Sequence, residues 1–120
     1  MPDETASLAI LEKLSQEEAI VPSIWLLEVS NVLLCAERAK RITLQQRQQA
    51  LYNLKELPIK IDQSTIDRVW FHTLDIATEQ GLTVYDASYI EIAIRYGIPL
   101  ATLDKALKRA AIALKIEVVV

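Results

Sequence analysis

Residues 82–107 read LTVYDASYIEIAIRYGIPLATLDKAL, and this stretch decides the fold. Its pattern predicts three successive elements, a helix over residues 85–96, a strand over residues 99–103 and a short helix over residues 104–111. Gly97 is expected to end the first of these helices. A strand enclosed between helices is typical of α/β proteins with a parallel sheet. Each helix begins beside an aspartate, Asp86 in the first case and Asp104 in the second.

The rest of the chain alternates between strands and helices in the same way. Strands are expected in the short apolar runs at residues 19–21, 59–61 and 116–120. Helices are expected over residues 3–18 and 24–40, from Thr43 to before Pro58, and from Ser64 to Gly81. Two of them open with capping boxes, formed by Thr43 with Gln46 and by Ser64 with Asp67. The sequence therefore predicts one α/β domain over residues 1–120, with a parallel sheet and helices on both faces.

Composition narrows the class of protein. The chain has 120 residues, of which 52% are hydrophobic, so it can bury a core and is not disordered. Its single cysteine, Cys35, excludes an intramolecular disulfide. The acidic start lacks the features of a signal peptide, and no apolar run approaches the roughly 20 residues that span a bilayer. We therefore expect a cytoplasmic protein with no membrane partner. The net charge of −3 argues against passive coating of nucleic acid, but not against an enzyme whose acidic residues hold cations.

Three carboxylates stand out as candidate site residues. Glu28 lies in an apolar helix that should be buried, where a charge needs a partner or a metal, and Asn31 follows on the same face. A partly exposed glutamate fits that pattern equally well. Asp86 and Asp104 are also ordinary residues for a helix N-terminus, and Thr83 with Asp86 fits a capping box. Because parallel strands share one carboxyl edge, we expect the three carboxylates to converge there, where oxygen ligands suit Mg²⁺ or Mn²⁺.

Residues 82–107, together with VPSIWLLEVSNVLL at residues 21–34, resemble the PIN-domain ribonucleases, and specifically the VapC-type toxins of toxin–antitoxin pairs. The resemblance implies a PIN-like sandwich with a parallel sheet, endoribonuclease activity that depends on Mg²⁺ or Mn²⁺, and neutralisation by a cognate antitoxin protein. It also implies the site residues by motif: Glu28, Asp86 and Asp104 as catalytic and metal-binding carboxylates, with Asn31 and Thr102 as supporting polar residues.

The chain departs from that family at its start. Members of the family begin with a strand that ends in an Asp-Ala-Ser-like motif, which supplies the centre of the sheet and a first aspartate. Here Pro2-Asp3-Glu4 resembles the sequence that follows such a strand. We therefore expect the first strand to be missing, a segment of about fifteen residues. A sheet without its centre leaves unpaired backbone groups, so we expect dimerisation, strand exchange or rearrangement to compensate.

Three other features of the sequence have less specific interpretations. His72 is expected to be structural or on the surface, because the carboxylate mechanism needs no histidine. Cys35 is expected to be buried as a small apolar residue. Basic residues follow Asp104 in the sequence, and either contact RNA phosphates or form an ordinary solvated face: Lys105, Lys108, Arg109 and Lys115.

Two alternatives to an active ribonuclease toxin follow from the same residues. The first is a catalytically impaired, truncated PIN domain that acts only as an antitoxin-binding or self-associating module. The second is a phosphoacceptor domain, another small α/β fold with carboxylates at the sheet edge. It ranks last because the paired acidic residues expected after a first strand are absent.

Overall fold

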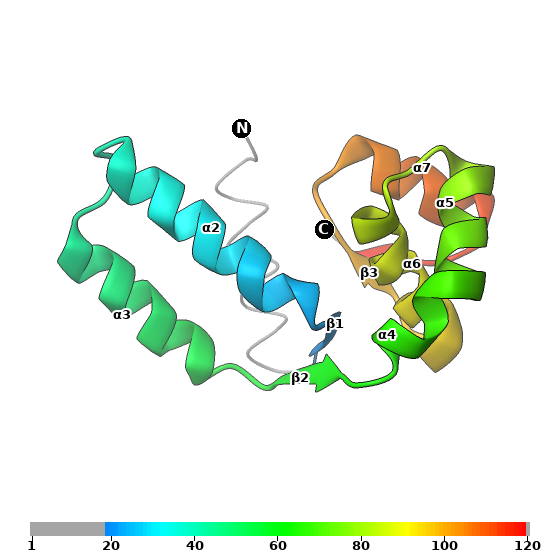
Figure 1. Cartoon of the computed structure of the whole chain (residues 1–120), viewed down its shortest axis with the longest axis horizontal. Helices are drawn as coiled ribbons and strands as arrows, with labels where there is room; N and C mark the ends of the chain where they lie inside the picture. Colours follow the sequence, from blue (N-terminus) through cyan, green and yellow to red (C-terminus); the bar gives the residue numbers. More distant parts are fainter. Residues whose placement is uncertain (1–18, 120) are drawn as a thin grey trace.

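The computed structural model describes residues 19–119, and the predicted helix over residues 3–18 lies outside this range. The described residues alternate between strands and helices, as predicted (Figure 1). The elements are β1 (Ala19–Pro22), α2 (Ile24–Arg38), α3 (Leu44–Lys55), β2 (Ile59–Asp62), α4 (Thr65–Arg68), η1 (Val69–Thr73), α5 (Leu74–Gln80), α6 (Val84–Tyr96), β3 (Leu100–Ala101), α7 (Lys105–Ala113) and β4 (Val118–Val119).

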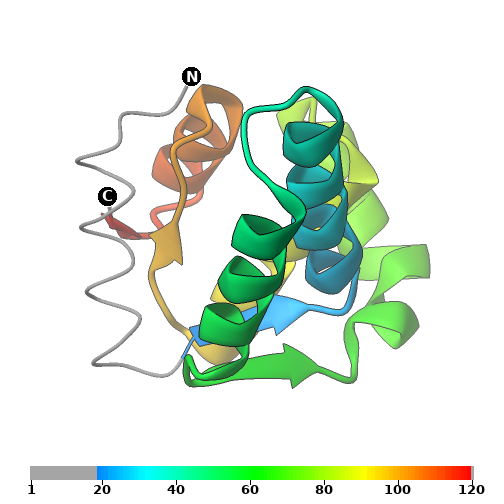
Figure 2. The ribbon, with the colours of Figure 1, turned by 90° about the vertical axis from the view of Figure 1, so that its left-hand side faces the viewer.

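The strands pair in parallel, but they do not form the single sheet that the sequence predicts. β1 pairs with β2, with Ala19 opposite Ile59, and β3 pairs with β4, with Leu100 opposite Val118. Within residues 19–119 no strand joins the two pairs, so the described strands form two sheets of two strands each. Figure 2 shows β1 and β2 side by side beneath α2 and α3, with β3 apart from them on the side of α7.

Helix ends follow local capping chemistry in some places and depart from it in others. The Thr43–Gln46 capping box forms, with Gln46 N–H donating to the Thr43 hydroxyl at 3.1 Å. Gly81 and Gly97 end their helices with φ of 65° and 64°, the left-handed conformation that favours glycine. The predicted box at Ser64 does not form, because its φ of −97° and ψ of −5° are not the extended conformation of a capping residue.

The helix predicted from Ser64 to Gly81 contains an irregular middle. α4 passes into a π-helical segment, η1, and then into α5. Thr73, the last residue of η1, is completely buried, and no described group bonds to its hydroxyl. His72 beside it is exposed, in agreement with a surface role. A π-helical turn breaks the side-chain register between the two flanking helices.

The prediction that the helix containing Glu28 is buried is wrong. α2 has no buried residue, and Leu27 and Val32 are 68% and 66% exposed. The reason is architectural: α2 packs alongside α3 as a pair that stands apart from α5, α6 and α7 (Figure 1). Cys35, predicted to be buried, is also exposed on this helix.

The hydrophobic core lies around α6 and α7. Its central cluster consists of Ile90, Leu100, Leu107, Ala110 and Ala111. α6 contacts η1, α5, α7, β1 and β3, so it is the element against which both pairs of strands are placed. Among the described residues, no helix is both long enough and apolar enough to cross a bilayer.

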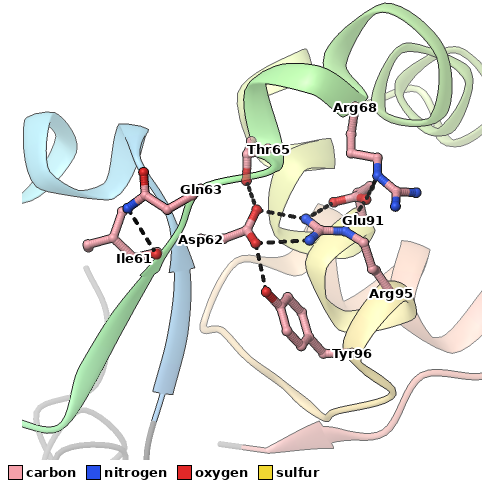
Figure 3. Close-up of polar contacts among 8 residues, drawn as sticks. All are labelled: Ile61, Asp62, Gln63, Thr65, Arg68, Glu91, Arg95 and Tyr96. Atoms are coloured by element: carbon pink, nitrogen blue, oxygen red, sulfur yellow. Dashed lines mark hydrogen bonds and ion pairs between the residues drawn. The ribbon is translucent and has the colours of Figure 1, made fainter.

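A buried polar cluster ties the end of β2 to α6 (Figure 3). Both carboxylate oxygens of Asp62 accept hydrogen bonds from the Arg95 guanidinium, at 2.9 and 2.7 Å. Asp62 also accepts from Thr65 at 2.6 Å and from the Tyr96 hydroxyl at 2.8 Å. Arg95 is held in turn by Glu91, one helical turn earlier, at 2.7 Å. A charge-assisted, two-pronged contact of this kind fixes both distance and orientation between the elements that it joins.

Candidate functional site

Residues from α2 and from the start of α6 line one open pocket of about 510 Å³. Two of the three predicted carboxylates, Glu28 and Asp86, are among them, together with Asn31 and Thr83. They reach the same place because α2 begins where β1 ends and because α6 packs against β1. The fold therefore brings two acidic side chains together that are 58 positions apart in the sequence.

Asp86 occupies the first turn of α6. Thr83 is the N-cap, and its hydroxyl accepts the Asp86 backbone N–H at 3.1 Å. The other half of the predicted capping box, a bond from the Thr83 backbone N–H to the Asp86 carboxylate, does not form. The carboxylate therefore does not cap the helix. A carboxylate here also gains from the positive end of the helix dipole.

The pKa of Asp86 is raised above its ordinary value. The largest cause is burial, followed by the negative charge of Asp104 and then that of Glu28, while the neighbouring Thr83 side chain offsets part of the rise. Like charges disfavour ionisation only when they lie near one another. The charges of Glu28 and Asp104 therefore both act on Asp86, although the three carboxylates come from three different elements.

Glu28 accepts a short hydrogen bond from the hydroxyl of Tyr89 on α6. Burial and this bond both raise the pKa of the Tyr89 phenol, so the tyrosine remains a neutral donor. The ring of Tyr89 packs against the core cluster. Its contact with Glu28 was not predicted from the sequence. The two residues are 61 positions apart, so no local pattern could have indicated the pair. Tyr85, in contrast, lines the pocket and is 63% exposed.

Asp104 lies just outside this pocket. It is the N-cap of α7, and its Oδ1 accepts the Leu107 backbone N–H at 2.9 Å. The ordinary structural interpretation of Asp104 is therefore correct, and its charge nevertheless reaches Asp86.

The two predicted supporting residues also have specific places. Thr102 accepts the Asp104 backbone N–H on its hydroxyl at 3.0 Å, and so shapes the turn before α7. Asn31 lines the pocket, but its side-chain oxygen faces the Cys35 thiol, at 3.9 Å, and the bond recorded for Glu28 comes from Tyr89.

The carboxylates of this pocket can bind a hard cation together with water and a substrate phosphate. Within residues 19–119 no three acidic, histidine or cysteine side chains are close enough to hold a metal ion together. Mg²⁺ does not require such a cage, because it commonly keeps several waters and is held by one or two carboxylates plus a substrate phosphate. Glu28 and Asp86 can supply those two carboxylates, and Asp104 adds negative charge nearby.

A family model described as PIN domain matches residues 2–113, which is nearly the whole chain. PIN domains have a nuclease-type fold, and they generally depend on divalent metals. A search of curated proteins found no match.

Proposed function

We propose, because this chain belongs to the PIN-domain family, that it is a Mg²⁺- or Mn²⁺-dependent endoribonuclease of the cytoplasm. More specifically, it would be the VapC-type toxin of a toxin–antitoxin pair. The observation that carries the proposal is the convergence of Glu28 and Asp86 on one open pocket, where the charge of Asp104 also acts on Asp86. Such a grouping of like charges is costly in a protein without a cation and favourable in one that binds it.

In this mechanism Glu28 and Asp86 would bind the cation through oxygen, and Asp104 would contribute negative charge from the start of α7. A bound divalent ion supplies positive charge at the scissile phosphate and acidifies water for attack. Asn31 and Thr83, in the same pocket, would orient water or phosphate oxygens by hydrogen bonding. Thr102 would act by holding the turn that carries Asp104.

The RNA would be held partly by basic residues that follow Asp104 in the chain. α7 begins immediately after Asp104, and its exposed Lys105 and Arg109 belong to a group of four cations completed by Lys108 and Lys115. Lysine and arginine contacts to phosphates position nucleic acid without reading its sequence. This local positive charge offsets the net negative charge of the whole chain.

The antitoxin would bind apolar surface that the described fold leaves exposed. α2 offers Leu26, Leu27 and Val32, each at least half exposed, on the helix that also carries Glu28. A partner seated there would lie next to the pocket and could block it. The support for this partner is the family resemblance together with the exposed apolar side chains.

One observation favours the second candidate function, a catalytically impaired module that binds the antitoxin or self-associates. Within the described range no three potential ligands stand close enough to hold a metal together. If two carboxylates and water do not retain the cation, the chain keeps its interaction surfaces and loses its chemistry.

The two candidates are separated by cleavage of a mixed-sequence RNA in Mn²⁺ by the full chain. Asp86→Asn and an excess of EDTA should each abolish cleavage, because each removes the cation from the pocket. Asp75→Asn is the matched control, since Asp75 is an exposed aspartate in the first turn of a different helix, α5. It should leave the cleavage rate unchanged.

Loss of activity in Asp86→Asn is informative only if the variant stays folded. The raised pKa of Asp86 predicts how the substitution changes stability, and this can be measured. A carboxyl whose folded-state pKa is raised contributes its full stability only below its unfolded pKa, and loses it as pH rises through the folded pKa. At pH 7 the uncharged variant should therefore be at least as stable as the natural chain in urea unfolding. RNA cleavage that survives both Asp86→Asn and EDTA would contradict the proposed nuclease, and no cleavage by the natural chain would favour the impaired module.

A further inference from the structure

Glu28 is the only proposed metal ligand on α2, and α2 contains no buried residue that could fix it in place. A side chain on such a helix has several rotamers open to it unless something outside the helix restrains it. The restraint in this structure is the hydrogen bond from Tyr89, the one side-chain bond within residues 19–119 that joins α2 to α6.

Tyr89 is itself firmly placed. Its ring packs against the core cluster, beside residues such as Ile90 and Leu100, so the position of its hydroxyl is set by packing. It lies three residues after Asp86 on α6, one turn along the helix. The same rigid helix therefore carries one proposed ligand directly and holds the other by a hydrogen bond.

A carboxylate has two oxygens, and Tyr89 occupies only Oε1 of Glu28. The second oxygen is left for a cation. A bond of this kind to a ligating carboxylate fixes its orientation, and loss of such partners typically weakens metal affinity about 10- to 100-fold. Asn31, the neighbour that the sequence suggested for this task, has its oxygen turned to Cys35.

We propose that Tyr89 is a positioning residue for the metal site: its hydroxyl orients the Glu28 carboxylate in the pocket that Glu28 shares with Asp86, so that a divalent cation can bind there. This inference rests on the proposed function, and it adds a residue that acts on the cation only through Glu28. The phenol takes no part in proton transfer and touches neither cation nor RNA.

The test is Mn²⁺ binding to the full chain, measured by isothermal titration calorimetry for the natural protein and for Tyr89→Phe. The variant keeps the ring and its packing and removes only the donor. Its Mn²⁺ dissociation constant should rise about tenfold or more. A dissociation constant within twofold of the natural value would overturn the proposal.

Tyr96→Phe is the matched control. Tyr96 lies on the same helix, and its hydroxyl also donates to a carboxylate, Asp62, at 2.8 Å. Its loss should lower the unfolding temperature without changing Mn²⁺ affinity. An equal loss of affinity in Tyr96→Phe and Tyr89→Phe would show that any loosening of α6 weakens the site, and would overturn the specific role of Tyr89.

A second measurement uses the natural chain alone, and so does not depend on a variant that folds. With ¹³C-labelled tyrosine, titration with Mg²⁺ should shift the ring resonances of Tyr89 and leave those of Tyr96 in place. Mg²⁺ binding without any shift at Tyr89 would overturn the proposal, whereas absence of Mg²⁺ and Mn²⁺ binding altogether would overturn the proposed function with it.

Discussion

Asp62 contacts helix α6 and Asp86 lies on it, yet the surroundings of these two aspartates move their pKa values in opposite directions. Hydrogen bonds from Arg95 are the largest cause of the depressed pKa of Asp62, and they outweigh its burial. No cation among the described residues lowers the pKa of Asp86, so burial and the neighbouring carboxylates raise it. The ionised form of Asp62 therefore stabilises the fold, and the ionised form of Asp86 opposes it until a cation binds.

This difference predicts a pH-dependent cost of Asp62→Asn. At pH 7 the variant should lose about 3 kcal/mol of unfolding free energy, because it leaves Arg95 without its main partner in a buried site. A carboxyl with a depressed folded pKa stabilises above its unfolded value of 3.8, and that contribution is lost as pH falls below it. Urea unfolding at pH 7 and at pH 3 should show the gap between variant and natural chain narrowing in acid.

Asp67→Asn is the control for that measurement, since Asp67 is an exposed aspartate on α4. Its unfolding free energy should change by no more than about 0.5 kcal/mol. A gap between Asp62→Asn and the natural chain that is the same at both pH values would refute the assignment of the ionised Asp62 as a stabilising group.

At this scale the sequence indicated the charged groups of the candidate site but not their partners. Glu28 was conspicuous as a charge in an apolar run, and Asp86 and Asp104 by their positions after predicted strands. Tyr89 and Arg95 act across 61 and 33 positions of sequence, and such contacts leave no local periodicity to detect. Whether the three carboxylates perform the proposed chemistry stays a prediction.

Among the described elements, η1 has an irregular, π-helical backbone and ends at a buried polar side chain that lacks a hydrogen-bond partner. A threonine in an α-helix can donate its hydroxyl to the carbonyl four residues earlier, as Thr78 does to Leu74 at 2.9 Å. Thr73 ends the π-helical segment, is completely buried, and has no recorded partner among the described residues. An unpaired buried hydroxyl carries its desolvation cost with nothing to offset it.

Thr73→Val should therefore stabilise the protein, by about 1 kcal/mol, because it keeps the shape of the side chain and removes the unpaired hydroxyl. Equilibrium urea unfolding would measure this change. Thr78→Val is the matched control: its hydroxyl is bonded and exposed, so its removal should be neutral or slightly destabilising. Destabilisation by Thr73→Val would mean that the hydroxyl has a partner, such as an ordered water.

Element boundaries were predictable where a single residue decides them. Gly81 and Gly97 adopt the left-handed conformation that their positions suggested, and the Thr43–Gln46 box forms. The Ser64 box failed because Ser64 does not adopt the extended conformation of a capping residue; the neighbouring Thr65 donates its hydroxyl to Asp62, within the polar cluster with Arg95. The π-helical turn was not predictable, since it accommodates packing against α6 and has no signature in composition.

Many large apolar side chains of the described residues are exposed to solvent. Along α4, η1 and α5 these are Ile66, Trp70, Phe71 and Leu74, with Trp70 75% exposed and Phe71 69% exposed. Exposed aromatic residues gathered in one helical segment mark a surface that another molecule covers. Together with two strand pairs that do not join, they support the expectation of self-association.

Sedimentation velocity of the isolated chain should therefore show a dimer or larger species. Trp70→Ser combined with Phe71→Ser should shift the distribution toward the monomer, because it removes the two most exposed aromatic side chains of this segment. Tyr52→Ser, at a 62% exposed aromatic on α3, controls for loss of a surface aromatic elsewhere. A natural chain that remains monomeric over the full concentration range would contradict the expectation.

The order of the strands and helices and their parallel pairing were predictable, but whether the strands form one sheet was not. Alternating strands and helices with parallel pairing followed from the apolar runs at Ala19 and Ile59 and from the stretch around Leu100. Whether the pairs merge into one sheet depends on a strand between them, and the described residues supply none. A pattern of elements fixes their order, but the closing of a sheet depends on contacts between distant segments.

The position of the hydrophobic core has a consequence for how the protein is made. The central cluster draws its residues from one stretch of the chain, between Ile90 and Ala111. Contacts between residues close in sequence form fastest, so α6 and α7 can organise first, whereas β1 must reach α6 from more than sixty positions away. On the ribosome, however, residues 19–62 emerge earlier and wait with the leucines of α2 exposed. The order of synthesis is thus the reverse of the order in which these local contacts form.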